Sequence, residues 1–120
     1  WIQAFEKEGI KIHAVTPQNE PLNHGNSASL FMGWEEARDF IKTGLGPAFK
    51  EAGVTTKIYV FDHNYNYDNL ADQKSYPTKI YDDAEASQYI AGAAYHNYGG
   101  NRSELLNINK LYPNKELLFT

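Results

Sequence analysis

The sequence predicts an α/β fold in which parallel strands alternate with helices. Segments with a strand-like hydrophobic pattern alternate along the chain with segments of helical periodicity. No Asn-Gly hairpin signal joins one strand-like segment to the next. The 120 residues, 42% of them hydrophobic and 22% charged, suffice for one domain, and no internal boundary divides residues 1–120. Alternating elements imply parallel strands joined by helical crossovers.

The first half of the chain contains two helix–strand pairs. Trp1–Glu8 has helical spacing and ends at a glycine, and Ile10–Thr16 alternates as a strand does. An apolar stripe predicts a helix over Gly33–Ala52, which a Gly-Leu-Gly-Pro run should kink midway. Thr56–Asp62 is almost continuously apolar, as expected of a strand covered on both faces.

The second half continues the alternation with two strands and shorter helices. The predicted elements are an irregular stretch or short helix at Asn69–Tyr81, a turn or two of helix at Asp83–Gln88, a strand at Ile90–Tyr95, a helix at Arg102–Lys110 and a strand at Lys115–Thr120. Asn101 and Glu104 resemble a capping box for the last of these helices.

Polar side chains follow three successive strands where each one ends. Glu20 follows the first strand, and we expect Pro21 to hold it in an extended conformation. Asp62, His63 and Asn64 follow the second strand, and a His-Asn-Tyr run follows the third. The carboxyl ends of parallel strands share one edge, where ligands bind. No glycine-rich phosphate loop follows any strand, so a partial (β/α)8 barrel is favoured over an open nucleotide-binding sheet.

Two kinds of chemistry fit these loops. Glycoside hydrolysis needs two carboxylates across the scissile bond. Glu20 suits the general acid/base, and the neighbouring Asn19 can donate to or accept from a sugar hydroxyl. Asp62 is conceivable as the second carboxylate, although a short side chain at a strand end suits a supporting acceptor better.

The other chemistry is a metal site built from His24, His63, His96 and Asp62. These histidines have neither His-x-His nor His-Glu-x-x-His spacing, so we expect neither a metal nor another cofactor. The net charge of −4 gives no reason to expect nucleic-acid binding. No apolar run is long enough to span a membrane.

Four motifs together resemble glycoside hydrolase family 30. They are Thr16-Pro-Gln-Asn-Glu-Pro21, Phe61-Asp-His-Asn64, Ala94-Tyr-His-Asn-Tyr-Gly-Gly100 and Glu116-Leu-Leu-Phe-Thr120. This family of retaining (β/α)8 enzymes includes glucosylceramidases and β-1,6-glucanases. The resemblance covers nearly the whole chain and implies that it corresponds to strands four to seven of the barrel, with the intervening helices.

The resemblance also implies roles for individual residues. Glu20 would be the acid/base and Asn19 would bind the 2-hydroxyl of the sugar. His96 would neighbour the acid/base, and Tyr98 would hydrogen-bond the nucleophile. The remaining mouth-lining residues would be Asp62, His63 and Asn64.

This sequence departs from the family pattern in two places. Asn97 stands where many relatives have a tryptophan, which leaves the substrate preference open. The family nucleophile is a glutamate directly after the Phe-Thr of the last strand, beyond Thr120. We therefore expect a fragment of one catalytic domain that is inactive alone, with a carbohydrate substrate and the rest of its own barrel as partners. By resemblance the intact protein would be secreted, periplasmic or on the cell surface. The alternative is a non-catalytic carbohydrate-binding barrel.

Overall fold

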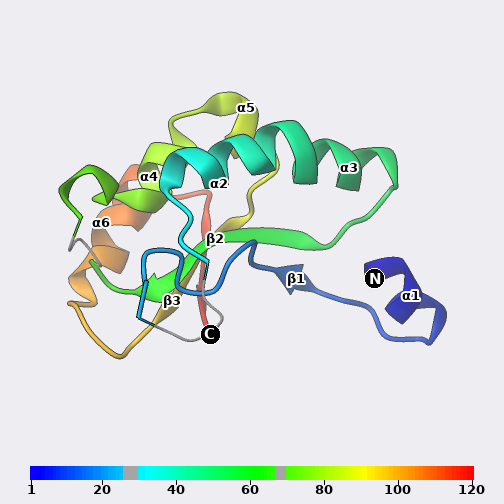
Figure 1. Ribbon diagram of the computed structural model, residues 1–120, viewed down its shortest axis with the longest axis horizontal. Coiled ribbons are helices and arrows are strands. Elements are labelled where there is room, and N and C mark those ends of the chain that lie inside the picture. Colours follow the sequence, from blue (N-terminus) through cyan, green and yellow to red (C-terminus); the bar gives the residue numbers. More distant parts are fainter. Residues whose placement is uncertain (26–29, 67–69) are drawn as a thin grey trace.

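A computed structural model of the chain describes residues 1–25, 30–66 and 70–120. Its strands form one four-stranded sheet in the order β1-β2-β3-β4, and each strand runs parallel to its neighbour. Helices connect successive strands, and α2, α3, α4 and α5 lie on the same side of the sheet (Figure 1). The predicted α/β class with parallel strands is confirmed.

The strands differ from the predicted ones mainly in length. They are β1 at Ala14–Val15, β2 at Lys57–Asn64, β3 at Gly92–His96 and β4 at Glu116–Phe119. The predicted strand Ile10–Thr16 was too long, because only Ala14 and Val15 pair with β2. Ile10 is 51% exposed, so its place in the alternating pattern does not correspond to burial. Of the described strands, only β2 lies beside β1, and a single neighbour gives this segment little reason to stay regular.

Strand β2 runs two residues further than predicted and is irregular near its carboxyl end. Its pairing register with β3 shifts between Phe61 and His63. Phe61 and Asp62 have φ angles of +77° and +45°, in the left-handed region that non-glycine residues rarely adopt. Such a bulge changes the direction in which side chains point at a strand end. The strain is therefore located where the polar residues of the second motif begin.

The predicted helix over Gly33–Ala52 consists of three helical segments. These are α2 at Trp34–Phe40, a π-helical segment at Ile41–Leu45 and α3 at Gly46–Glu51. Pro47 lacks the N–H that an uninterrupted α-helix would use, and the wider π turn accommodates this loss. Gly46 is required for packing, because a Cβ atom there would lie 2.3 Å from the Tyr89 ring. The predicted kink is thus a change of helical type.

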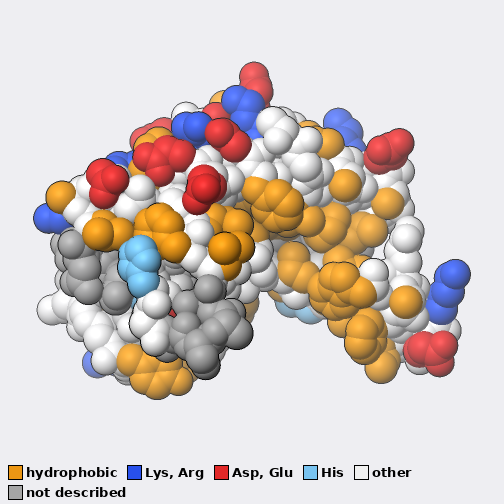
Figure 2. Space-filling model, in the orientation of Figure 1, with side chains coloured by type: hydrophobic (Ala, Val, Ile, Leu, Met, Phe, Trp, Pro, Cys, Tyr) orange, Lys and Arg blue, Asp and Glu red, His pale blue; other side chains and the backbone are white. Residues whose placement is uncertain are grey.

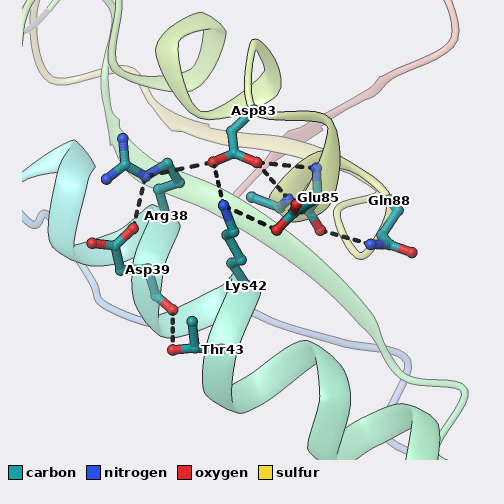
Figure 3. Close-up of polar contacts among 8 residues, drawn as sticks. Arg38, Asp39, Lys42, Thr43, Asp83, Glu85 and Gln88 are labelled. Carbon is teal, nitrogen blue, oxygen red and sulfur yellow. Dashed lines mark hydrogen bonds and ion pairs between the residues drawn. The ribbon is translucent and has the colours of Figure 1, made fainter.

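The shorter helices are close to their predicted positions. They are α1 at Ile2–Lys7, a 3₁₀ turn at Ala71–Gln73, α4 at Tyr76–Tyr81, α5 at Ala84–Ser87 and α6 at Ser103–Leu111. Asn69, predicted as the start of one irregular stretch, lies outside the described residues. Asp83 caps α5 by accepting hydrogen bonds from the backbone N–H groups of Glu85 and Ala86 (Figure 3).

Both residues of the capping box predicted for α6 accept hydrogen bonds. The Asn101 side chain does accept a hydrogen bond, from the Ser103 N–H at 2.9 Å. The Glu104 carboxylate, however, accepts a hydrogen bond from the backbone N–H of Asn66, in the segment after β2. Glu104 therefore makes a tertiary contact that its spacing from Asn101 did not indicate.

The core lies between the sheet and the helices on its covered side. Ile58 and Val60 of β2 are buried there with Ile41 of the π-helical segment and Ile80 of α4. Figure 2 shows charged side chains gathered over the helical edge and hydrophobic ones around the hollow beside α1. Phe119 at the end of β4 is 69% exposed. In the described part of the chain, no helix is long and apolar enough to cross a membrane.

Candidate active site

The loop after β1 holds Glu20 against the carboxyl end of β2. The Glu20 N–H donates to the Asp62 carbonyl oxygen at 3.0 Å, and the Glu20 carbonyl oxygen accepts from the Asn23 N–H at 2.9 Å. Glu20 has a φ angle of +44°, so the extended conformation predicted from the following Pro21 was wrong. The two backbone hydrogen bonds hold Glu20 in this unusual conformation. They place its carboxylate at the same edge of the sheet as the polar ends of β2 and β3.

His96, the last residue of β3, lies between two carboxylates. Its Nδ1 is 2.8 Å from Glu20 Oε1, and its Nε2 is 3.1 Å from Asp62 Oδ1. The three side chains are 11%, 11% and 9% exposed for His96, Glu20 and Asp62. We call these three residues the acid/base cluster. They come from the loop after β1, from β2 and from β3, and meet only in the folded chain.

Asp62 is held by hydroxyl groups as well as by the imidazole. Its Oδ2 accepts a hydrogen bond from the Thr16 hydroxyl at 2.8 Å, and its Oδ1 accepts one from the Thr120 hydroxyl at 2.6 Å. Asp62 therefore links the ends of all four strands. A carboxylate engaged by three donors is a supporting acceptor, which favours the second of the two roles considered for it from the sequence.

Burial and hydrogen bonds act on the Glu20 carboxyl in opposite directions. Burial by itself would raise the pKa of Glu20, whereas hydrogen bonds from Asn23 and His96 lower it. The Asn23 amide donates to Glu20 Oε2 at 2.8 Å. The net direction is a lowered pKa, so this environment favours the carboxylate form.

His63 is the most deeply buried member of the site. Burial lowers its pKa to about 4, so the ring is neutral near pH 7. Its Nδ1 accepts a hydrogen bond from the Asn64 N–H at 2.7 Å. Because a neutral imidazole has one acceptor nitrogen, the proton lies on Nε2. His63 is therefore a neutral side chain that is fully buried, and it does not face solvent at the edge of the sheet.

Asn64 and Tyr98 connect the ends of β2 and β3. Asn64 Oδ1 accepts a hydrogen bond from the Tyr98 N–H at 2.8 Å. The Tyr98 ring is 87% exposed and meets the His96 ring edge-on, with 5.9 Å between centroids. Asn19 is also exposed, directly before Glu20. The fold therefore brings the predicted site residues to one edge, with Asn19 and Tyr98 at its solvent side.

The sequence did not indicate site roles for an asparagine and two threonines that lie at this edge. Asn23 binds the carboxylate of Glu20, and the hydroxyls of Thr16 and Thr120 bind Asp62. Both threonines lie within the quoted motifs. Threonine is common at such positions for structural reasons alone, so its presence there did not indicate a hydrogen bond to Asp62. Asn23 follows Glu20 by three residues in a turn, and that spacing was the available signal.

The four residues considered as metal ligands from the sequence do not form one cluster in the described part of the chain. His24, one of its four residues, stacks on Phe31 with 4.5 Å between ring centroids and 12° between planes. Among residues 1–25, 30–66 and 70–120, no three His, Asp or Glu side chains form a group that could hold a metal ion.

Comparison with known proteins identifies the family of the chain. All of residues 1–120 match the family model described as the glycosyl hydrolase family 30 TIM-barrel domain. The chain belongs to glycosyl hydrolase family 30. The predicted partial (β/α)8 barrel is thereby confirmed, because the parallel sheet corresponds to part of this domain.

Several family 30 relatives have known activities. The chain is 34% identical over its whole length to an endo-1,6-beta-D-glucanase of Neurospora crassa, of which it covers 24%. It is 29% identical over 98% of its length to the lysosomal acid glucosylceramidase of Mus musculus, of which it covers 23%. The chain thus spans about a quarter of the length of these relatives.

Two solved structures have the same arrangement of elements. The endo-beta1,6-glucanase BT3312 is 76% identical, with a TM-score of 0.97 over 100% of this chain and 26% of that one. SrfJ from Salmonella typhimurium is 28% identical, with a TM-score of 0.84 over 99% of this chain and 26% of that one. The overall backbone arrangement is therefore similar at both 76% and 28% sequence identity.

Proposed function

We propose that this chain is the acid/base-bearing section of a retaining β-glycoside hydrolase that acts on β-1,6-glucan. The observation that carries the proposal is the acid/base cluster, in which Glu20 is held by His96 and Asn23 at the carboxyl edge of a parallel sheet. In (β/α)8 enzymes that edge is where the catalytic residues lie. Family 30 membership supplies the reaction class.

In the proposed reaction Glu20 acts twice. Its carboxyl group first protonates the oxygen of the departing sugar while a second carboxylate attacks the anomeric carbon. The Glu20 carboxylate then takes a proton from water, which releases the sugar from the second carboxylate. By family resemblance Asn19 would bind the 2-hydroxyl group, and Tyr98 would hydrogen-bond the attacking carboxylate.

The second carboxylate is assigned to a glutamate directly after Thr120. The position of Thr120 supports this assignment, because its N–H donates to the Tyr95 carbonyl oxygen at 3.1 Å and its hydroxyl to Asp62. The next residue would therefore continue from the edge that carries Glu20. A second carboxylate about 5–5.5 Å away would raise the pKa of Glu20 and oppose the lowering described above, as a general acid requires.

The choice of β-1,6-glucan as substrate depends on the comparisons. The 76% identical structure is an endo-beta1,6-glucanase, whereas the glucosylceramidase relative is 29% identical. Asn97 lies in the exposed segment after β3. Family members with tryptophan at this position would present an aromatic ring there in place of the smaller amide. Export of the protein, inferred from the family, belongs to the same proposal, and a signal sequence in the complete gene would support it.

The proposal is tested with the protein encoded by the complete gene. We expect release of glucose or short oligosaccharides from β-1,6-glucan and a loss of about 10²–10⁴-fold in Glu20→Gln. The matched control is Glu85→Gln, an exposed carboxylate on the helical side, which should keep full activity. Turnover by Glu20→Gln at the wild-type rate would refute the role of Glu20.

The alternative of a non-catalytic carbohydrate-binding barrel is decided by the same samples. A binding protein would hold β-1,6-glucan without turnover, equally well in wild type and Glu20→Gln. The isolated 120-residue piece should give no turnover of an aryl β-glucoside, since the proposed second carboxylate lies outside it. Hydrolysis by the isolated piece would show that the assignment of the second carboxylate is wrong.

A further inference from the structure

Asp62 has a place in the acid/base cluster that the proposed mechanism does not use. Its side chain meets the imidazole nitrogen opposite the one that faces Glu20, with Oδ1 at 3.1 Å from Nε2. We infer that Asp62 is a positioning residue that keeps the Nε2 proton on His96, and thereby keeps an acid proton between His96 and Glu20. This inference rests on the proposed function, because it concerns the same acid.

The hydrogen bonds around Asp62 fix the first proton. Its two oxygens face the Thr16 hydroxyl, the Thr120 hydroxyl and the imidazole Nε2. An ionised carboxylate only accepts hydrogen bonds. The imidazole must therefore present N–H at Nε2, and Nδ1 is left to face Glu20.

The contact between Nδ1 and Glu20 Oε1 needs a second proton. At 2.8 Å it is a hydrogen bond only if one of the two atoms carries hydrogen. Either Glu20 is a neutral acid that donates to Nδ1, or His96 is an imidazolium that donates to the carboxylate. If neither atom were protonated, two lone pairs would face each other at that distance. The pair thus resists losing its last proton.

This proton accounts for both steps of the reaction. When the glycosidic oxygen takes the proton from Glu20, the carboxylate and a neutral His96 with hydrogen on Nε2 remain. In the second step the attacking water gives one proton to Glu20, and the pair returns to its starting state. No proton is created or lost, and the hydrogen on Nε2 stays in place throughout.

The other titratable groups around His96 do not compete for this role. His63, which precedes Asn64 on β2, is neutral near pH 7 because burial lowers its pKa to about 4. Tyr98 meets the His96 ring edge-on and is exposed to solvent. Within the described residues, Glu20 and Asp62 are the carboxylates that contact the His96 nitrogens.

The test compares leaving groups and pH profiles for Asp62→Asn in the full-length protein. A poor leaving group needs the acid, whereas a dinitrophenyl leaving group does not. We expect kcat/KM to fall about 100-fold on β-1,6-glucan and less than about 10-fold on a dinitrophenyl β-glucoside. The alkaline limb of the β-1,6-glucan profile should move down by about one pH unit. Asp83→Asn, the same replacement in a half-buried ion-pair cluster on the helical side, should leave both unchanged.

Equal losses on both substrates with an unmoved alkaline limb would assign Asp62 a purely structural role and overturn the inference. A direct measurement covers the case in which Asp62→Asn does not fold. The ¹⁵N shifts of His96 in the wild-type protein, assigned with His96→Gln, should report hydrogen on Nε2 across the active pH range. An unprotonated Nε2 at neutral pH would also overturn the inference.

Failure of the proposed function is recognised separately. If wild-type protein hydrolyses neither substrate, the proposed function fails, whatever the histidine spectrum reports. If wild-type protein is active, but His96 lacks hydrogen on Nε2 or Asp62→Asn loses equal activity on both substrates, the role of Asp62 is refuted and the proposed function is not.

Discussion

Two charge clusters in this chain use the same kinds of side chain and differ in burial. The acid/base cluster at the strand ends has side chains that are 9–11% exposed. The helix-side cluster, made of Arg38, Asp39, Lys42, Asp83 and Glu85, joins α2 and the π-helical segment to α5 (Figure 3). There the Glu85 and Asp39 side chains are 73% and 59% exposed.

The difference in burial changes what the same contacts do. Lys42 lies 3.1 Å from both Asp83 and Glu85, distances similar to those in the acid/base cluster. Water reaches these pairs, because the Lys42 and Asp83 side chains are 30% and 21% exposed and Glu85 is 73% exposed, so each pair contributes less to stability than its short distance suggests. In the acid/base cluster water is largely excluded, and removing one partner leaves an uncompensated charge. Short ionic contacts alone therefore do not distinguish the two clusters, whereas burial at the carboxyl ends of the strands does, and this burial supports the proposed site.

The largest expected effect comes from removing the shared imidazole. In His96→Leu, Glu20 and Asp62 lose the donor that lies between them, and two buried carboxylates remain. We expect activity to fall at least about 10²-fold and the free energy of unfolding to fall by about 3 kcal/mol. Activity assays and denaturant unfolding of the full-length protein measure both. Unchanged stability would show that the two carboxylates do not need a common donor.

A smaller effect is expected from Asp83→Ala in the helix-side cluster. The variant loses the α5 cap and the ion pair with Lys42, and its melting temperature should fall by about a few degrees without loss of activity. Hydrogen bonds from Ala86 and Lys42 lower the pKa of Asp83 below its ordinary value of 3.8.

The pH dependence of that effect has a definite sign. Because the pKa of Asp83 is lower in the folded chain, its contribution to stability is present above the ordinary value of 3.8 and is lost as the pH falls through the lowered pKa. The melting temperatures of wild type and Asp83→Ala should therefore converge once the pH falls below the lowered pKa of Asp83. A gap that widens in acid would contradict this interpretation.

The smallest effect is expected from Lys42→Met. This variant removes a half-buried ion pair with Asp83 and an ion pair with the exposed Glu85, while keeping most of the side chain that packs along the helix. We expect the melting temperature to change by no more than about 1 °C, and the difference to vanish in 1 M NaCl. A large difference that persists in high salt would show that the helix-side cluster acts like a buried one.

Much of the fold follows from patterns that are local in the sequence. The apolar run of β2 and the stripe of the helix after Gly33 needed no distant partner to be recognised. The limits of β1 were less predictable, because alternation at Ile10 and Ile12 cannot tell whether a neighbouring strand lies alongside. Glu104 illustrates the same point, since its spacing from Asn101 predicted a cap but could not indicate its contact with the distant Asn66.

For the candidate site, the sequence by itself determined which residues stand at the strand ends and in which order. Their types, together with the four motifs, indicated Glu20 as the candidate acid/base and predicted the family. The comparisons confirmed the family. The tertiary structure alone decided which of them touch. It placed His96 between Glu20 and Asp62, buried His63 and left Tyr98 exposed. The physical reason is that a hydrogen bond needs atoms within about 3 Å. Partners 34 and 76 residues apart reach that distance only after β2 and β3 have paired and the loop after β1 has folded over their ends.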